Sequence, residues 1–419
     1  MVRRIMPLLL MVLTCVPLRA QEPELSWRRP EPVEVFDAVW ELARDRFYDP
    51  GMNGVDWPAA RERHRADARA AESPEDLSEA IDALLAELGA SHTARYTPDE
   101  ATYYHLLDVF GRKPELRDLL SRSFPRGVRY DGLEAWLERD GDSLVVTGLW
   151  YGGNADRAGL FTGDEILAVD GESPHPIRSF REKGGKEATL TVRRRPREDP
   201  REIVVPVVSI RPNLAFLNAT QRSVRVLDHA ERRIGYIQIP SYASSRVQDV
   251  LVREMFDGKF READALLIDI RGGIGGASPS YVDPFLPGPV LTMRSRSGEV
   301  SVEPRRWTRP VGLLIDEGTR SGKEVIAHAF RKYNLGPVIG ENTAGAVLGG
   351  TVFVLPDDSI LSLAVVEVEV DGARIEGAGV EPDIGVSFDP KHAADVDPQL
   401  ERALDELAER AAARETNND

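Results

Sequence analysis

The sequence predicts an α/β protein of several domains, in which a helical unit and a β-rich module precede an α/β core. Three patterns predict this order: helical periodicity up to about residue 122, short β runs split by Gly and Asp turns from about 130 to 212, and alternating buried strands and helices after about 213. At 419 residues the chain is too long for one ordinary core. We therefore expect units at 21–122, 123–212 and 213–388, and a C-terminal helix and tail at 389–419.

Residues 1–20 are typical of a secretory signal peptide. Two arginines precede an apolar run from Ile5 to Val16, and the small Ala20 stands before the expected cleavage site. The only cysteine, Cys15, lies in this segment; lipid anchoring there is the alternative, although the Val-Leu-Thr before it fits such a signal poorly. We expect a periplasmic or extracellular protein whose mature chain has no thiol and no integral membrane segment.

The charge balance disfavours nucleic acid as a partner. Asp plus Glu total 69 against 53 Lys plus Arg, a formal charge of -16, and the charges are interspersed as on solvated helix faces. The 7 histidines include no His-x-x-x-His pair, and the mature chain has no cysteine. No metal site and no cofactor are therefore expected.

Three amphipathic helices are expected in the first unit. Apolar residues repeat at helical spacing from Phe36 to Phe47, a second helix follows Asp56-Trp57-Pro58, and the third has Ser73 as its cap and Gly89 as its end. The pair Ser91-His92 comes directly after this third helix. A histidine at such a place is usually a surface or capping residue, so the pair alone does not indicate a site.

Short β runs dominate the next unit, at 144–146, 166–169, 190–192 and 203–207. Two of its segments, Gly152 to Leu160 and Gly163 to Gly171, resemble the most recognisable part of a PDZ domain. PDZ modules bind an extended peptide, often a chain end, at a sheet edge. The resemblance implies that Gly132 and Leu133 belong to a substrate-binding loop that takes a carboxylate. The alternative is a β module that only spaces its neighbours.

The core begins with two buried strands, at 234–239 and 265–270, with a helix between them. The second strand leads into a glycine-rich run at 271–276, where glycines let a backbone approach a ligand closely. A phosphate cradle is the rival interpretation. The run lacks the Lys-Ser/Thr ending and the Gly-x-Gly-x-x-Gly spacing of such loops.

Ser321 lies where a third buried strand, Val311 to Ile315, gives way to a helix. This position suits a nucleophile, because the side chain stands at the sheet edge and the first free N–H groups of the helix can stabilise an oxyanion. The stretch from Ser321 to Glu324 also fits a capping box, so the serine has a purely structural alternative. Lys323 is expected to point away from the hydroxyl.

The last part of the chain predicts two strands, at 351–355 and 360–370, and a tight turn at Asp371-Gly372. Glu376 follows this turn, where a carboxylate would ordinarily be a solvated charge. Apolar residues between Pro398 and Leu407 predict a surface helix before a polar end.

Together these motifs resemble the C-terminal-processing and tricorn-type serine peptidases. The resemblance covers nearly the whole mature chain and rests on the Ser-His pair, the PDZ-like module and five core motifs: Tyr236 to Pro240, Asp269-x-Arg271 with its glycines, Ser321-x-x-Glu324, Gly340-Glu-x-Thr-x-Gly345 and Gly379 to Asp383. It implies a crotonase-like or Clp-like spiral core. It also implies proteolysis near polypeptide C-termini, with polypeptides as the partners; an oligomer fits the resemblance equally well.

Within that family the sequence favours a histidine base. The C-terminal-processing branch carries a lysine in the motif Thr-Phe-Gly-Lys-Gly, and Ala346 stands at that place here. The tricorn branch uses a Ser-His pair and a downstream glutamate, which Ser91, His92 and Glu376 resemble. The resemblance implies that His92 takes the proton of the attacking serine and returns it to the leaving amine.

The same resemblance assigns the supporting groups. Glu376, through Ser91, would orient the imidazole. The oxyanion would be held by the N–H of Gly322 and by one N–H from Gly275 or Gly276, although Gly-Gly-Ile-Gly-Gly departs from the family's Asn-Gly-Gly-Gly order.

Two other functions are weighed against proteolysis. Ala346 favours a peptide-binding scaffold built on a decayed protease fold, but a decayed site would not be expected to retain the whole set of serine, histidine and glutamate. A crotonase-like acyl-transfer enzyme acting on a thioester would bind a coenzyme and cleave no peptide. The PDZ-like module counts against this third function.

Overall fold

The computed structural model describes residues 30–418 except 289, 304, 392 and 395. The predicted signal peptide, residues 1–20, lies outside the described residues. A six-stranded sheet forms the centre, in the order β18-β15-β14-β11-β10-β9, and all neighbours are parallel except β9 and β10. Its strands are β9 (Arg225–His229), β10 (Arg232–Gln238), β11 (Ala265–Asp269), β14 (Val311–Ile315), β15 (Val338–Gly340) and β18 (Ile384–Gly385).

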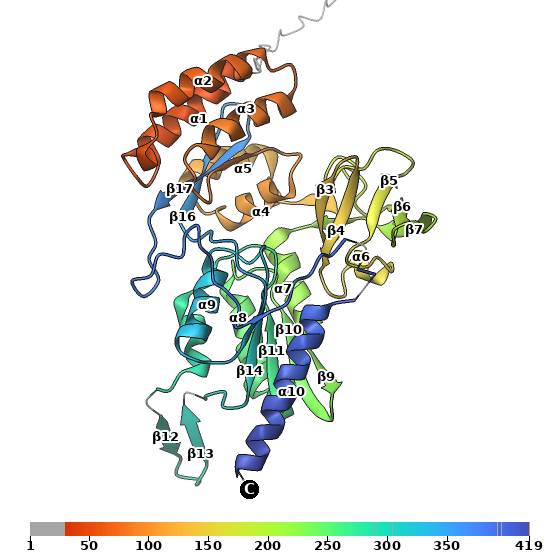
Figure 1. The fold of residues 1–419 in the computed structure, drawn as a ribbon, viewed down its shortest axis with the longest axis vertical. Helices are drawn as coiled ribbons and strands as arrows, with labels where there is room; N and C mark the ends of the chain where they lie inside the picture. Colours follow the sequence, from red (N-terminus) through yellow and green to blue (C-terminus); the bar gives the residue numbers. More distant parts are fainter. Residues whose placement is uncertain (1–29, 289, 304, 392, 395, 419) are drawn as a thin grey trace, which may run out of the picture.

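Helices cover both faces of this sheet (Figure 1). One face packs against α8 (Ser245–Phe256) and α9 (Gly322–Lys332), and the other packs against α10 (Pro398–Asn418). The C-terminal helix lies at the surface, as the sequence predicts, and one of its faces is buried against the sheet. Ala403 and Leu407 of α10 are fully buried, because without them the apolar side chains of β10, β11 and β14 on this face would meet water.

The first three helices end where the sequence predicts, at α1 (Pro32–Arg46), α2 (Trp57–Ala70) and α3 (Pro74–Ala86). Their apolar faces pack against β16 (Gly349–Val354) and β17 (Ile360–Val366), which come from the far end of the chain. The short β1 (Ala94–Tyr96) pairs with β17. Residues 349–366 thus belong in space to the N-terminal unit, and this pairing fixes the loop that carries Ser91 and His92.

Five antiparallel strands form the β module, in sequence order. They are β3 (Ala135–Asp140), β4 (Ser143–Leu149), β5 (Glu165–Val169), β6 (Glu187–Arg193) and β7 (Arg201–Pro206), with the short α6 (Asn154–Arg157) between β4 and β5. The module has its own apolar core. Trp136 of β3 and the buried Trp150 stack with Phe216 and so bind the module to its neighbours.

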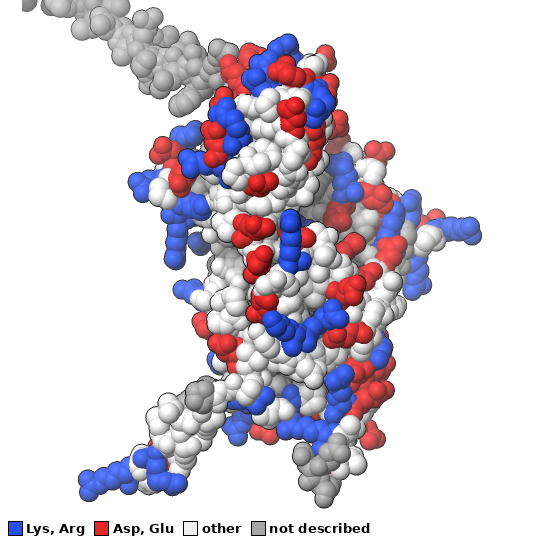
Figure 2. Space-filling model, turned by 60° about the vertical axis from the view of Figure 1, so that its left-hand side comes forward, with Lys and Arg blue, Asp and Glu red and all other residues white. Residues whose placement is uncertain are grey.

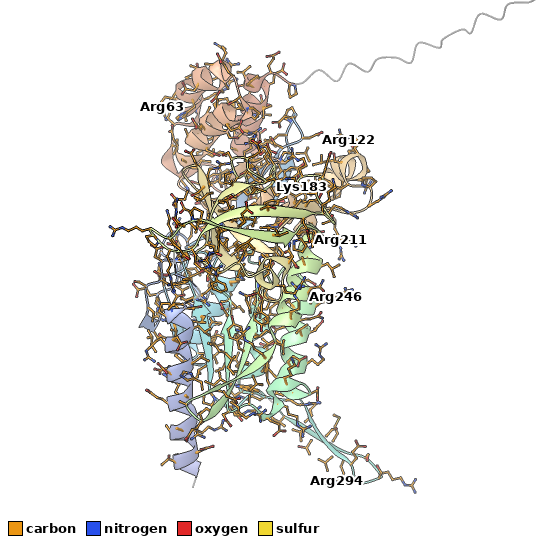
Figure 3. The ribbon with its side chains drawn as sticks, turned by 90° about the vertical axis from the view of Figure 1, so that its right-hand side faces the viewer. Arg63, Arg122, Lys183, Arg211, Arg246 and Arg294 are labelled. Atoms are coloured by element: carbon orange, nitrogen blue, oxygen red, sulfur yellow. The ribbon has the colours of Figure 1, made fainter. Side chains whose placement is uncertain are left out.

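Smaller elements connect these units. Helices α4 (Ala101–Val109) and α5 (Arg117–Ser123) pack beside α7 (Pro212–Ser223), and β2 (Tyr130–Gly132) pairs with β8 (Val208–Ile210). A hairpin of β12 (Leu291–Arg294) and β13 (Val300–Glu303) projects from the body, with Arg294 near its tip (Figure 3). Short 3-10 turns lie at Met52–Gly54, Pro114–Leu116, Lys259–Glu262 and Pro279–Phe285.

Acidic and basic side chains alternate over the surface in Figure 2, without a broad patch of one sign on that face. In the part of the chain that the structure describes, no helix combines the length and the apolar character that a bilayer span needs.

Candidate active site

Ser321 occupies a strained turn between β14 and α9. Its φ of 57° and ψ of -131° lie outside the regions that non-glycine residues favour, which costs about 1–3 kcal/mol. The backbone N–H of Ser321 donates to the carbonyl of Ala346 at 2.8 Å. Ser321 and Glu324 form a capping box, as the sequence predicts, in which the carboxylate accepts from the N–H of Ser321. The N–H of Glu324 donates to the carbonyl of Ser321 at 2.8 Å, and the hydroxyl makes no separate cap hydrogen bond. A strained strand-to-helix turn that exposes a free hydroxyl is a typical setting for a nucleophile.

Glu324 holds this turn in shape. Its buried carboxylate accepts four hydrogen bonds: from the N–H of Ser321 at 3.0 Å, of Ala346 at 2.8 Å and of Gly345 at 2.7 Å, and from the hydroxyl of Thr343 at 2.6 Å. Burial raises the pKa of Glu324, and these donors oppose the rise. One carboxylate therefore connects the serine turn to the loop of residues 343–346.

A glycine-rich loop follows β11 and lies against the serine. Ile274 donates to the carbonyl of Pro240 at 3.0 Å, and Tyr242 donates to that of Gly275 at 3.0 Å, so the loop follows the end of β10. A Cβ added to Gly275 would lie 2.5 Å from the Cβ of Ser321. Only glycine allows this close approach. The contact explains why residue 275 is a glycine, although the sequence leaves its role uncertain.

Lys323 also holds the glycine-rich loop in place. The side chain is fully buried, and its ammonium donates to the carbonyls of Pro240 at 2.9 Å and Gly272 at 3.0 Å. Burial lowers the pKa of Lys323 to about 7. The expectation that Lys323 points away from the hydroxyl agrees with these contacts, but the residue is far from an ordinary surface lysine.

We expect Lys323→Met to lower kcat/KM roughly tenfold, because the carbonyls of Pro240 and Gly272 lose their donor. The pH dependence of the free energy of unfolding should also differ between this variant and the wild type. The unfolded lysine has a pKa near 10.4 and the folded one about 7, so between these values the unfolded state binds more protons and wild-type stability rises with pH.

Denaturant titrations at pH 7 and pH 9 measure this difference, and Lys323→Met should lose the rise that Lys323 contributes. Lys332→Met on the same helix is the matched control, because Lys332 is exposed and pairs with Asp371. Equal pH slopes in wild type and Lys323→Met would contradict the burial of a titrating amine.

His92 reaches the site from the loop between α3 and β1. Its φ is 54°, its carbonyl accepts from the hydroxyl of Ser362 at 3.0 Å, and a Cβ added to Gly350 would lie 3.0 Å from its own Cβ. The ring nitrogen Nε2 is buried and has no hydrogen-bond partner among the described residues. Ser321 lines the same cleft, and an imidazole nitrogen without a partner can accept a proton from a serine that reaches it.

The surroundings of His92 favour its neutral form. Burial lowers the pKa of His92, and the charge of Arg320 lowers it further. Glu376 and a hydrogen bond to the backbone of Ala346 oppose that shift. Ala346, at the position where the C-terminal-processing branch has its lysine, accepts from the N–H of Ser321 through its carbonyl.

Glu376 and Ser91 lie together behind the imidazole. The carboxylate accepts from the N–H of Ser91 at 2.9 Å and from its hydroxyl at 3.0 Å. It also accepts from the N–H groups of Val347 at 2.9 Å and Leu348 at 3.2 Å. Residues 285 positions apart are thereby joined, which fixes the loop of His92 relative to the 343–348 segment.

We expect Glu376→Gln to reduce kcat/KM roughly tenfold or more. The NH2 of the new amide is a donor, so it cannot accept from the backbone N–H groups that the carboxylate binds. The acid limb of the pH profile should also move to lower pH. Glu376 raises the pKa of His92, so its neutralisation lets that pKa fall and the imidazole stays neutral in more acid.

The matched control is Glu369→Gln, an exposed carboxylate in the same segment. Loss of activity with an unchanged acid limb would mean that Glu376 only holds the loops and does not act on the imidazole.

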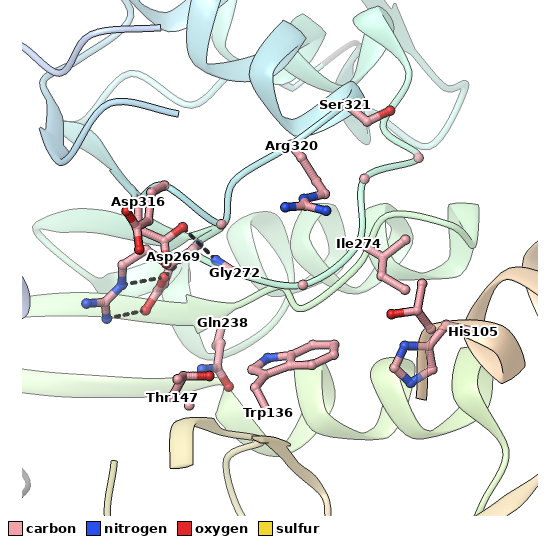
Figure 4. Close-up of a pocket in the computed structure, with 18 of the residues that line it drawn as sticks. His105, Trp136, Thr147, Gln238, Asp269, Gly272, Ile274, Asp316, Arg320 and Ser321 are labelled. Carbon is pink, nitrogen blue, oxygen red and sulfur yellow. Dashed lines mark hydrogen bonds and ion pairs between the residues drawn. The ribbon is translucent and has the colours of Figure 1, made fainter. Parts of the chain in front are cut away.

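Ser321 and His92 open into a cleft of about 1100 Å³ where the α/β core, the β module and α4 meet. Figure 4 shows Trp136 and Thr147 of the β module on one side and Gly272, Ile274 and Arg320 on the other. The cleft lining also includes apolar residues of the α4 region, namely Leu106, Val109 and Phe110. A cleft with an apolar wall and polar rims at the carboxyl ends of parallel strands is a common place for a ligand.

The structure brings together most of the predicted site residues. Ser321, His92, Gly275 and Gly276 line the cleft, and Ser91 and Glu376 support His92. Gly322 begins α9 and packs against Ala277. Gly132 and Leu133 are not part of the cleft: Gly132 pairs with Val208, and Leu133 is 3% exposed in the core of the β module. The side chain of Leu133 is therefore used for packing, and the peptide-binding role of this loop stays a prediction.

The sequence does not reveal the contacts of three residues next to Ser321. It indicates Glu324 only as half of a capping box and Lys323 only as a residue that points away from the hydroxyl, and it gives no signal for Arg320. Lys323 and Glu324 are buried, and a charged side chain is costly to bury unless it is paired or hydrogen-bonded. No group of three His, Cys, Asp or Glu side chains among the described residues is placed to share a metal ion.

Two family models match the chain. The model of peptidase family S41 matches residues 233–386, which contain Ser321 and Glu376, and the model of the tricorn protease C1 domain matches residues 28–86. His92 follows the second match by a few residues and lies outside both.

Named relatives agree with these matches. The chain is 28% identical over 391 residues to the putative tricorn protease homolog 2 of Streptomyces coelicolor, which covers 88% of the chain and 31% of the relative. It is 23% identical over 366 residues to the carboxyl-terminal-processing protease of Synechocystis, covering 82% of the chain and 78% of the relative. The chain spans about a third of the length of the tricorn relatives it matches.

Solved structures share the fold. The tricorn protease structure superposes with a TM-score of 0.55 at 20% identity, over 91% of this chain and 37% of that one. The photosystem II D1 C-terminal processing protease gives 0.52 at 21% identity, over 91% and 99%. Both have mixed α/β multidomain folds, as found here. The chain therefore contains a region that matches peptidase family S41, at residues 233–386, and a region that matches the tricorn protease C1 domain, at residues 28–86, and it is similar in sequence to tricorn and carboxyl-terminal-processing proteases.

Proposed function

We propose that the chain hydrolyses peptide bonds through an acyl-enzyme on Ser321, with neutral His92 as the base. The observation that carries this proposal is that the side chains of Ser321 and His92 line one cleft, where the buried Nε2 of His92 has no hydrogen-bond partner among the described residues. The supports of the two side chains also meet in one segment, because the carbonyl of Ala346 accepts from the N–H of Ser321 and the N–H of Val347 donates to Glu376.

The chemical steps follow from this arrangement. Ser321 Oγ attacks the scissile carbonyl while His92 takes its proton, and the imidazolium then protonates the leaving amine. Water, activated by the same imidazole, hydrolyses the acyl-enzyme. The N–H groups of Gly275 or Gly276 and of Gly322 are the candidate oxyanion donors, and the close contact between Gly275 and Ser321 supports the first of them.

We further propose that the substrates are polypeptides cleaved near their C-termini in the periplasm or outside the cell. Similarity to carboxyl-terminal-processing proteases supports a C-terminal preference, and the predicted signal peptide supports export. The β module, which resembles a PDZ domain in sequence, is the candidate for recognising the chain end.

A fluorophosphonate reagent tests the mechanism directly. We expect covalent labelling that maps to Ser321 by peptide mass spectrometry, together with hydrolysis of an unfolded protein such as casein. Folded protein that takes no label and cleaves nothing would favour the peptide-binding scaffold. Binding of a thioester coenzyme without peptide cleavage would favour an acyl-transfer enzyme.

A further inference from the structure

Arg320 directly precedes the nucleophile in the chain, and no ion pair neutralises its charge within the described residues. Its side chain is exposed, lines the cleft, and extends into it between Asp316 and Ile274 (Figure 4). Within the described residues, Arg320 has no hydrogen bond or ion pair through its guanidinium. Its backbone is held in place, because its carbonyl accepts from Lys323 and would lie 2.9 Å from a Cβ at Gly275.

The other two arginines of the cleft lining are both occupied. Arg271 donates to Asp269 at 2.7 Å and to Asp397 at 2.8 Å. Arg225 is stacked over the rings of Tyr151 and Tyr236, with its Cζ at 4.1 and 4.3 Å from the ring centroids. The Nη1 of Arg225 has no hydrogen-bond partner among the described residues, but it is buried, whereas Arg320 is exposed in the cleft. Arg320 is thus the arginine of this lining whose guanidinium is accessible to a substrate.

The field of Arg320 reaches the space where the scissile bond must lie. Its charge lowers the pKa of His92 and opposes the burial that raises the pKa of Tyr96, and both side chains line the cleft. The nearby wall from α4 is apolar, at Leu106 and Val109. A carboxylate placed between this wall and the guanidinium would be partly shielded from water, where a two-pronged arginine contact is strong.

We propose that Arg320 binds a carboxylate of the substrate next to the scissile bond, so that this site prefers peptides with Asp or Glu beside the cleaved bond. The inference rests on the proposed peptidase function and gives it a substrate class. A free chain end so close to the bond would offer the same carboxylate chemistry, and the peptides below separate the two sources.

The test uses internally quenched peptides that carry Glu or Gln beside the cleaved bond, each as a free acid and as a C-terminal amide. For the wild type we expect kcat/KM to favour Glu about tenfold to a hundredfold. Arg320→Gln should remove this preference, and Arg320→Glu should reverse it in favour of Gln. Arg294→Gln, on the projecting hairpin, is the matched control and should behave as wild type.

A second readout excludes a merely structural role. With a neutral peptide, Arg320→Gln should move the acid limb of kcat/KM to higher pH, because a charge that lowers the pKa of His92 is removed. A preference for the free acid over the amide, lost in Arg320→Gln, would support the carboxylate site with the chain end as its source.

The opposing outcomes are distinct. If the wild type cleaves Glu and Gln peptides, acids and amides, with equal kcat/KM, or if Arg320→Gln keeps the preference, Arg320 does not select the substrate and the peptidase function stands. If no peptide is cleaved and the fluorophosphonate does not label Ser321, the proposed function fails and this inference fails with it.

Discussion

Ser321→Ala should abolish peptide hydrolysis, with a loss of roughly 10^4-fold or more, because no other group can form the acyl-enzyme. The fold should be kept. The hydroxyl of Ser321 makes no separate cap hydrogen bond, so we expect the free energy of unfolding to change by less than about 1 kcal/mol. Initial rates on an internally quenched peptide and a urea titration measure the two effects.

Two companion variants sharpen this test. Ser321→Gly should be equally inactive but more stable than Ser321→Ala, because glycine adopts a φ of 57° without strain. Ser280→Ala, on an exposed turn, is the control and should keep full activity. Turnover retained by Ser321→Ala would remove the serine from the mechanism.

The local elements were predictable because each one carries its own signals. Ser73 caps α3 as the sequence predicts, accepting from the N–H of Asp76 at 3.0 Å, and the buried runs at β10, β11 and β14 appear as parallel strands. These features depend on neighbouring residues and on periodicity, and both can be recognised directly in the sequence.

The partners of those elements were not predictable in the same way. Nothing near residue 360 indicates that β17 pairs with β1, or that it packs against α1 to α3. The periodicity of α10 shows an apolar face but not which strands this face covers. Contacts between distant segments depend on the whole fold, which a single pattern does not contain.

The site shows the same division. Ser321, Ser91, His92 and Glu376 could be named, because motif order and a family resemblance point to them. The structural roles of Glu324 and Lys323 could not be predicted, because they depend on which carbonyls and N–H groups the folded loops bring to these side chains. The free guanidinium of Arg320 is likewise visible only once its neighbours are known to be paired elsewhere.

His92→Ala should be nearly as damaging as Ser321→Ala, with a loss of about 10^2–10^4-fold in kcat, since the serine then has no base. For the wild type, activity should fall in acid as the imidazole takes a proton. Burial and Arg320 lower the pKa of His92, so the midpoint of this acid limb should lie below the ordinary value near 6.5. Rates of wild type and His92→Ala between pH 4 and pH 9 measure both effects.

The rival base is Lys323, whose pKa of about 7 would also permit proton transfer near neutrality. Its ammonium is committed to the carbonyls of Pro240 and Gly272, and a lysine base would make activity climb as the pH rises through its pKa. We expect Lys323→Met to keep the acid limb of the wild type, and His229→Ala, whose histidine pairs with Asp405 away from the cleft, to keep full activity. An inactive Lys323→Met beside an active His92→Ala would transfer the role of base from the histidine to the lysine.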